Sequence, residues 1–299
     1  MKKTTLLKKM IMEKKALVVP GAYDALSAKL IEKAGFKAIQ ASGFGLAACY
    51  LGKPDVGLLT QTEMVDFTRN MANAVDIPVM GDADTGFGNA INAMRAVREF
   101  EQAGCAGLNI EDQEFPKRCG HMEGKQLISK EEMVKKVEAA CEAREDKDFV
   151  INARTDAIAI YGIDEAIKRG KAYADAGADL IFVEAPQTKE QITRIAEEVG
   201  APISINLFDS IKGGKTPLMT YKELRELGVA RVSVPVGTIF AAVKGLQNYL
   251  DVIKKEIAPG RYDLVCKFDE FKALVGLPEM KELEKEFLPK EIFKQKYGR

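Results

Sequence analysis

Short apolar runs alternate with amphipathic helical stretches along most of the chain, and this alternation predicts a β/α protein. Glycine just past a helix end, followed by a buried strand, is typical of the second half of a βαβ unit. The apolar runs are nearly continuous, which favours parallel strands buried on both faces. This sequence pattern, a helix end followed by glycine and then an apolar run, occurs four times, as EKAGFKAIQASG (32–43), EQAGCAGLNIEDQ (101–113), ADAGADLIFVEAP (174–186) and RELGVARVSVPVG (225–237).

The number of strands favours a barrel over an open sheet. Eight β/α units in roughly 240 residues match the size of a (β/α)8 TIM barrel. A doubly wound open sheet would place a GxGxxG phosphate loop after its first strand. The first strand of this chain instead reads into VVPGAYDA, which lacks that motif. We predict an α/β barrel over 1–245, with a charged helical extension of the same domain over 246–299. The strands are expected to begin near residues 16, 37, 77, 106, 149, 179, 202 and 230.

Composition excludes several classes of partner. Lys+Arg and Asp+Glu both number 44, so no net charge points to nucleic acid or to an anionic membrane. No segment approaches ~20 apolar residues, and the basic first residues lack the apolar stretch of a secretory signal. The five cysteines are scattered without a CxxC pair, which fits free thiols better than disulfides or a zinc site. We expect a cytoplasmic globular protein.

Polar residues stand at the predicted ends of strands two to seven, which meet at one end of a (β/α)8 barrel. Several carboxylates around a single arginine would repel one another unless a cation lay among them. Because no His or Cys cluster accompanies these oxygen ligands, that cation is expected to be Mg²⁺ or Mn²⁺. The residues are Ser42, Gly43, Asp82, Asp84, Glu111, Asp112, Arg154, Asp156, Glu184 and Asn206.

Asp82 and Asp84 lie two residues apart in GDADTGFGN, so both point to the same side if the strand continues through them. An alternative is a turn that Asp and Gly stabilise, which also explains Gly86 and Gly88. That alternative leaves two carboxylates at the barrel mouth unexplained. Which carboxylates bind the metal directly stays open at this point.

The segment IEDQEFPKRCGHMEGKQ at 110–126 holds the only histidine of the chain and one of the cysteines. It belongs to a loop of about sixteen residues, and long loops in compact domains are usually disordered or functional lids. The loop ends at a capping box that begins with Ser129. Gly120 and Gly124 offer the freedom to close such a lid.

Cys119 stands beside Arg118 and near His121 in this loop. An electropositive setting lowers the pKa of a thiol or readies it for proton transfer. The alternative is an ordinary surface cysteine, but over a metal site we expect Cys119 to be catalytic. His121 has two readings, a hydrogen bond that anchors the lid or an acid–base role.

KRCGH at 117–121 resembles the signature of the isocitrate lyase and phosphoenolpyruvate mutase superfamily. The resemblance covers nearly the whole chain, in the order of the family. It implies Mg²⁺-dependent α/β barrels, with Mn²⁺ able to substitute, that form dimers of dimers and exchange C-terminal helices between subunits. The other motifs are ASGFG (41–45), GKPDVGLLT (52–60), DADTGFGN (82–89), EDQ (111–113), ARTDA (153–157), FVEAP (182–186) and TPL (216–218).

The resemblance also implies roles for the site residues. Asp82 and Asp84 would bind Mg²⁺ directly or through water, with Glu111 supporting the hydration shell. Cys119 would be the general acid, and Arg154 would bind a carboxylate or enolate oxygen. Glu184 is a further catalytic position and, with Tyr23, one of two candidates for the unidentified base. The implied substrate contacts are Ser42, Gly43, Phe44, Asp82, Gly120, His121, Arg154 and Asn206.

Three departures from family patterns narrow the expected reaction. Phosphoenolpyruvate mutases resemble PKxNS in the loop, so Cys119 favours C–C cleavage. Methylisocitrate lyases carry an arginine in a stretch resembling YPLSAFRA; this chain has VPVGTIFAA there, and Phe240 aligns with that arginine. Those enzymes also carry a tyrosine at the position where this chain has Gln40. The C-terminal segment is more similar to the mutase and dimethylmalate lyase branch.

These features predict an oxo-acid lyase for a small carboxylic acid with two carboxylates. The best candidate is 2,3-dimethylmalate, cleaved to pyruvate and propionate. The alternatives are 2-methylisocitrate cleavage, oxaloacetate hydrolysis and a phosphonomutase reaction. A metabolite-binding barrel without catalysis is a fourth possibility.

Overall fold

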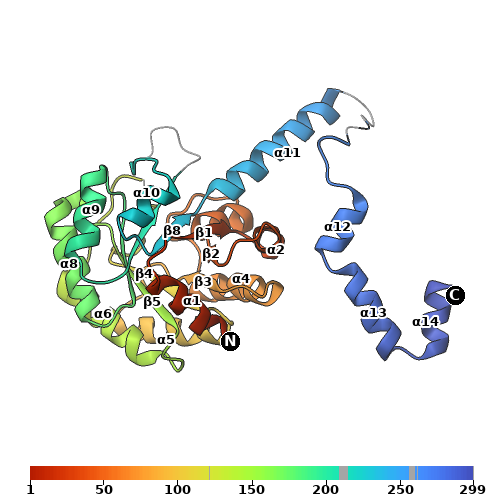
Figure 1. Cartoon of the computed structure of the whole chain (residues 1–299), viewed down its shortest axis with the longest axis horizontal. Coiled ribbons are helices and arrows are strands. Elements are labelled where there is room, and N and C mark those ends of the chain that lie inside the picture. Colours follow the sequence, from red (N-terminus) through yellow and green to blue (C-terminus); the bar gives the residue numbers. More distant parts are fainter. Residues whose placement is uncertain (121, 209–214, 256–259, 261, 299) are drawn as a thin grey trace. The chain divides into compact units, whose positions relative to one another are not determined.

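The computed structural model describes residues 1–120, 122–208, 215–255, 260 and 262–298. Eight parallel strands close into a barrel in sequence order, and β8 pairs with β1 (Figure 1). The predicted (β/α)8 barrel is therefore confirmed. The strands are β1 (Leu17–Ala22), β2 (Ile39–Ala41), β3 (Val79–Asp82), β4 (Gly107–Glu111), β5 (Val150–Thr155), β6 (Leu180–Val183), β7 (Ile203–Asn206) and β8 (Arg231–Val234).

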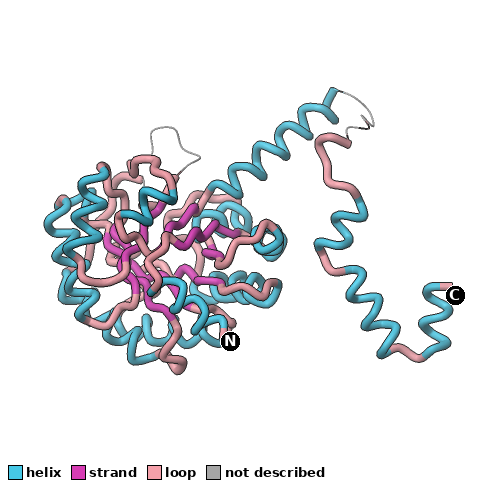
Figure 2. The backbone as a smooth tube through the Cα atoms, viewed as in Figure 1, coloured by secondary structure: helices cyan, strands magenta, loops and turns pink. Residues whose placement is uncertain are grey.

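Helices surround the strands of the barrel (Figure 2). The helices of the described residues are α1 (Lys3–Met12), α2 (Ala25–Lys33), α3 (Gly43–Leu46), a π-helical turn η1 (Ala47–Leu51), α4 (Gln61–Ala74), α5 (Ala90–Gln102), α6 (Lys130–Ala143), α7 (Ile158–Tyr161), α8 (Ile163–Asp175), α9 (Lys189–Glu198), α10 (Tyr221–Glu226), α11 (Gly237–Lys255), α12 (Phe268–Leu274), α13 (Leu277–Phe287) and α14 (Lys290–Tyr297).

Side-chain caps and glycines fix the limits of these helices. Ser129 caps α6 by accepting a hydrogen bond from the Glu132 amide at 3.1 Å, which satisfies one of the free N–H groups at a helix start. Glycine follows the helix in all four recurrent phrases, and its positive φ is a conformation that other residues rarely adopt. The four glycines, with φ between 76° and 104°, are Gly35, Gly104, Gly177 and Gly228.

Helix α1 closes the N-terminal end of the barrel. Leu7 and Ile11 lie one turn apart and are 0% and 1% exposed. They pack in one apolar cluster with strand residues such as Val19, Met80 and Val150. Sequence analysis did not predict this helix, because its many lysines obscure the apolar face. The opposite end of the barrel, where the strands end, is where the cavity lies.

The described chain forms two compact units, Met1–Phe240 and Ala241–Arg299. The first unit contains the barrel, and the second contains the later part of α11 together with α12 to α14. Large apolar side chains of the second unit are exposed, including Phe268 at 75% and Phe287 at 73%. A search of the described residues found no helix with the length and apolar character needed to cross a bilayer.

Candidate active site

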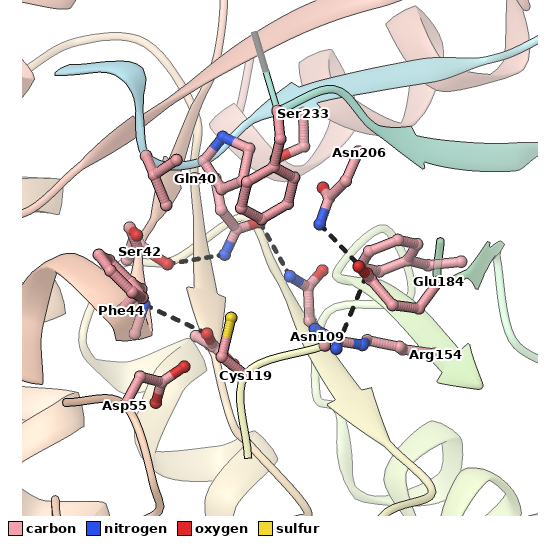
Figure 3. Close-up of a pocket in the computed structure, with 18 of the residues that line it drawn as sticks. Gln40, Ser42, Phe44, Asp55, Asn109, Cys119, Arg154, Glu184, Asn206 and Ser233 are labelled. Atoms are coloured by element: carbon pink, nitrogen blue, oxygen red, sulfur yellow. Dashed lines mark hydrogen bonds and ion pairs between the residues drawn. The ribbon is translucent and has the colours of Figure 1, made fainter. Parts of the chain in front are cut away.

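A cavity of about 60 Å³ lies at the C-terminal ends of the strands (Figure 3). A water needs roughly 10–15 Å³ by this measure, so the cavity has room for more than one water molecule. Cys119 lies between Ser42 and Phe44 on one side and Arg154 and Glu184 on the other (Figure 3). The predicted site residues that line the cavity are Ser42, Gly43, Phe44, Asp82, Cys119, Gly120, Arg154, Glu184 and Asn206.

Arg154 is the centre of an ion-pair network at the end of β5. Its Nε lies 2.8 Å from Asp156 Oδ2 and 3.3 Å from Glu111 Oε2, and its Nη2 lies 3.7 Å from Glu184 Oε2. Burial by itself would lower the pKa of Arg154, but Asp156, Glu111 and Glu184 hold it well above its usual value. The guanidinium therefore stays charged and can bind a substrate carboxylate.

Glu184 and Asn206, at the ends of β6 and β7, are brought together as predicted from their strand positions. Asn206 Nδ2 donates to Glu184 Oε2 at 3.3 Å, and this contact is visible in the close-up (Figure 3). Both side chains are buried and line the cavity. They form a polar wall beside Arg154 that can contact substrate oxygens.

Two of the three predicted metal residues lie beside the cavity and do not line it. Asp82 lines it, with Oδ2 accepting from Gly43 N at 3.2 Å and Oδ1 from Asp84 N at 3.2 Å. Strand β3 ends at Asp82, and Asp84 has a φ of 45°. The strand alternation considered for the two aspartates therefore does not extend to Asp84, which contacts Lys117 at 2.9 Å.

Lys117 and Asp55 were not predicted as site residues. The Lys117 ammonium lies 2.7 Å from Asp55 Oδ1, and its side chain is 5% exposed. Burial would lower the pKa of Lys117, but Asp84, Asp55 and Glu111 hold it well above its usual value. Asp55 belongs to the motif GKPDVGLLT, and Lys117 is the first residue of KRCGH. Membership of these motifs was the only feature of the sequence that could have pointed to either residue.

The carboxylates beside Asp82 fit the chemistry of a magnesium site. Among the described residues, Glu111 Oε1 is buried without a hydrogen-bond partner, and burial raises the pKa of Glu111. Burial also raises the pKa of Asp84 to about 7, against the effect of Lys117. Buried carboxylate oxygens without a hydrogen-bond partner, such as Glu111 Oε1, are the kind of donor that Mg²⁺ binds. Within the described part of the chain, no three acidic, His or Cys side chains converge closely enough to hold a metal by themselves, so the fit lies in the type of donor and leaves room for water between these carboxylates and a metal.

The loop between β4 and α6 lies against the cavity. The Gln113 side chain stabilises the loop internally: its Nε2 donates to the Arg118 carbonyl at 2.8 Å, and its Oε1 accepts from the Arg118 amide at 3.0 Å. The Cys119 amide donates to the Asp55 carbonyl at 3.2 Å. His121, predicted to contact the substrate, lies outside the described residues.

Gly120 lies very close to side chains of the cavity, which gives this glycine a role besides the flexibility it offers the loop. A Cβ atom at this position would lie 2.7 Å from the Glu184 side chain and would also meet the Arg154 guanidinium. Real Cβ atoms do not occur so near other heavy atoms, so a larger residue here would force the Arg154 and Glu184 side chains to shift. The loop therefore reaches directly onto the Arg154–Glu184 side of the cavity.

The floor of the cavity contains polar residues that sequence reasoning missed. Gln40 Oε1 accepts from Arg231 Nη2 at 2.5 Å and from Asn109 Nδ2 at 3.1 Å. Gln40 Nε2 donates to backbone carbonyls, including that of Gly81 at 3.1 Å. Arg231 is fully buried, and burial lowers its pKa to about 10. Gln40 thus uses its amide to brace the floor of the cavity.

An apolar wall stands near the polar residues. Phe44, Phe208 and Val236 line the cavity, and Phe240 packs edge-to-face on Phe44 with ring centroids 5.8 Å apart. Sequence analysis aligned Phe240 with an arginine of methylisocitrate lyases. In the structure Phe44 lines the cavity, whereas Phe240 contacts Phe44 and is not among the described residues that line it.

A (β/α)8 barrel with carboxylates, an arginine and a cysteine around a small cavity defines an enzyme for a small anionic substrate. Residues 7–254 match the family model described as phosphoenolpyruvate phosphomutase. The chain belongs to this family.

Similar proteins agree with this assignment. The chain is 45% identical to 2,3-dimethylmalate lyase of Eubacterium barkeri, over 93% of this chain and 96% of the relative. It is 41% identical to 2-methylisocitrate lyase of Aeropyrum pernix, over 94% of this chain and 89% of the relative. A solved phosphonopyruvate hydrolase complex with oxalate and Mg²⁺ has a TM-score of 0.85 at 31% identity, covering 97% of this chain and 100% of that one. The protein is accordingly a carbon–carbon lyase.

Proposed function

We propose that this enzyme cleaves a 2-hydroxy dicarboxylic acid, with 2,3-dimethylmalate as its best substrate and pyruvate and propionate as products. The observation that carries the proposal is the position of Cys119, which lines the same small cavity as Arg154 and Glu184. A thiol there can protonate a carbanion whose carboxylate is bound by the arginine. The 45% identity to 2,3-dimethylmalate lyase supports this choice of substrate.

The charges around the cavity favour two substrate carboxylates over three. Among the described residues that line it, the cations are Lys117 and Arg154, and Lys117 is already paired with Asp55 and Asp84. A third carboxylate would be buried against Phe44 or Phe208, and an unpaired buried charge costs several kcal/mol. A substrate methyl group would instead pack favourably on that apolar wall.

The reaction begins with removal of the proton from the C2 hydroxyl of the substrate. Of the two candidate bases, Glu184 lines the cavity, whereas Tyr23 packs in the apolar cluster around Phe208. Burial, with Asp24 and Cys49, also raises the pKa of Tyr23, which makes its phenolate harder to form. Glu184 is therefore the better base, with Asn206 holding its carboxylate in place.

Cleavage of the C2–C3 bond then makes the two products. The oxygen electrons form the C2 carbonyl of pyruvate, and the C2–C3 pair passes to C3, giving the enediolate of propionate. Arg154 stabilises the enediolate oxygens. Cys119 donates its thiol proton to C3, and Gly120 packed against Glu184 excludes water from this step. The proton on the base returns to the thiolate when the products leave.

A divalent cation is the cofactor that we propose for this site. Bound Mg²⁺ would polarise the C2 oxygen and offset the excess of carboxylates. The residues to hold it are Asp82, Asp84 and Glu111, directly or through water, and Mn²⁺ would substitute. The Mg²⁺ present in the phosphonopyruvate hydrolase structure supports this assignment.

We also propose a homotetramer built as a dimer of dimers. Exposed apolar side chains of the Ala241–Arg299 unit, such as Leu246 at 58% and Met280 at 53%, support the exchange of these helices between subunits. The 246–299 extension would then be completed by a neighbouring barrel. The five cysteines form no disulfide, which suits the reducing cytoplasm that we expect.

The test is a screen of 2-hydroxy dicarboxylic acids with Mg²⁺, coupled to lactate dehydrogenase so that pyruvate is detected as it forms. We expect 2,3-dimethylmalate to give stoichiometric pyruvate and propionate by NMR. Binding of pyruvate and Mg²⁺ without cleavage of any acid would instead mean a metabolite-binding barrel. Conversion of phosphonopyruvate alone to phosphoenolpyruvate, followed by NMR, would mean the phosphonomutase reaction.

A further inference from the structure

A buried lysine joins the loop between β4 and α6 to the end of β5. Lys125 Nζ lies 2.8 Å from Asp156 Oδ1 and also donates to the carbonyl of Gly120, the residue that follows Cys119. The Lys125 side chain is 3% exposed and that of Asp156 is 0% exposed. Removing one partner of a buried pair is far more disruptive than removing one from a surface pair.

The same Asp156 carboxylate binds the arginine of the cavity. Arg154 Nε donates to Asp156 Oδ2 at 2.8 Å, and Nη2 donates to Oδ1 at 3.1 Å. Behind it, the Asp156 amide donates to Asp112 Oδ1 at 3.1 Å, and Tyr173 holds the other oxygen of Asp112 at 2.8 Å. Asp156 is therefore fixed from behind while it pairs with one cation from the strand and one from the loop.

We propose that Lys125 is a positioning residue for the lyase reaction. It holds the Gly120 carbonyl, and with it Cys119, over the cavity, and it aligns Arg154 through their shared partner Asp156. The proton donor Cys119 and the cation Arg154, which both act on the developing carbanion, are thus positioned by the same Lys125 ammonium group. A misplacement of about 1 Å can cost ~100-fold in rate, so such a contact affects catalysis without touching substrate.

Lys117 holds the loop on the other side of Cys119, through Asp55 and Asp84. Because Lys117 lines the cavity, its substitution would change substrate contacts as well as loop position. Lys125 is not among the residues that line the cavity, so its substitution separates positioning from binding. The catalytic part of this inference rests on the proposed function, whereas the loop position does not.

The experiment measures alkylation of each cysteine by iodoacetamide in the full-length protein, followed by peptide mass spectrometry. In Lys125→Met, we expect Cys119 to react at least about tenfold faster than in wild type, because a buried charge-assisted contact no longer opposes opening of the loop. Exposed Cys49 should react at an unchanged rate, and buried Cys105 reports unfolding. Lys135→Met, at an exposed lysine of α6, is the matched control.

An unchanged Cys119 rate in a folded Lys125→Met protein would overturn the proposal. If Cys105 also becomes reactive, Lys125→Gln replaces it, since glutamine can still donate to Gly120 but cannot neutralise Asp156. There a rise of at least about threefold at Cys119 is expected, and no rise would overturn the proposal equally.

Kinetics complete the test. Lys125→Met should lower kcat by about 10- to 100-fold, because Cys119 acts only in the chemical step. KM should change less than about threefold, since Arg154 keeps Glu111 and Glu184 as partners. A wild-type kcat in a variant with faster alkylation would overturn the catalytic role. If wild type itself cleaves none of the tested acids, the proposed function fails, while alkylation still decides whether Lys125 holds the loop.

Discussion

The carboxylate of Asp156 accepts two hydrogen bonds from the Arg154 guanidinium, at 2.8 Å from Nε and 3.1 Å from Nη2. This two-point contact fixes the plane of the guanidinium at the edge of the cavity. Burial favours the protonated acid, but Arg154 and Lys125 lower the pKa of Asp156 to about 2. Asp156 therefore stays ionised and keeps Arg154 in position at every pH at which the enzyme would work.

Asp156→Asn should lower the free energy of unfolding by ~3–5 kcal/mol at pH 7, because it removes the carboxylate partner of buried Lys125 and the nearest of the three carboxylates around Arg154. An acid with a lowered folded pKa contributes stability above its unfolded pKa, about 3.9, and loses it as pH falls towards the folded value. Urea unfolding should thus give a difference between wild type and variant that is constant above pH 5 and shrinks between about pH 4 and 2. The exposed Asp164→Asn change is the control, and a difference independent of pH down to 2 would refute this account.

Cys119→Ala should lower kcat much more than it changes KM, because a proton donor acts in the chemical step. General acid catalysis contributes ~10²–10⁴-fold, and steady-state kinetics would detect a loss of that size. Cys49→Ala and Cys266→Ala, at exposed cysteines, are the controls. A loss below about tenfold would mean that the proton comes from another group.

Removal of divalent cations with EDTA should abolish turnover, and Mg²⁺ or Mn²⁺ should restore it. The reason is the excess of carboxylates, of which Glu111 has one buried oxygen without a hydrogen-bond partner among the described residues. Isothermal titration of Mg²⁺ into the metal-free enzyme gives a readout besides activity, and Asp82→Asn should weaken that binding. Full activity in a verified metal-free preparation would contradict the metal assignment.

The barrel could be predicted from the sequence because its parallel strands are almost wholly apolar. All four residues of β6 and of β7 are buried, so the runs stood out against the polar helices between them. Glycines such as Gly104 and Gly177 marked where each helix ends. Helix α1 escaped prediction because Leu7 and Ile11 are its main apolar contacts among many lysines.

The site could be predicted only where residues end a strand or belong to a recognised motif. Glu184 and Asn206 were found because parallel strands end at one edge. Arg231 was missed because it stands at the start of β8 and reaches Gln40 across the barrel, a contact without a sequence signal. Phe44 and Phe240 were each named from family motifs, but the sequence could not show that their rings are in contact.

Tyr173→Phe should destabilise the protein by ~1–3 kcal/mol, because it removes a donor from a buried carboxylate. Tyr173 and Asp112 are both fully buried, and the hydroxyl donates to Asp112 Oδ2 at 2.8 Å. Urea unfolding at pH 7 would measure the change, with Tyr262→Phe at an 86% exposed tyrosine as the control. The Arg169 guanidinium lies 3.0 Å from the same oxygen. A difference below a few tenths of a kcal/mol would show that Asp112 Oδ2 is satisfied without the tyrosine hydroxyl.

The most direct test of the proposed activity compares kcat/KM for 2,3-dimethylmalate and 2-methylisocitrate in the lactate dehydrogenase assay with Mg²⁺. Phe44, backed by Phe240, offers an apolar surface where a third carboxylate would need a cation. The penalty for that carboxylate and the gain from packing a methyl group act in the same direction. We therefore predict a preference for 2,3-dimethylmalate of at least ~100-fold, and an equal or higher kcat/KM for 2-methylisocitrate would contradict the account.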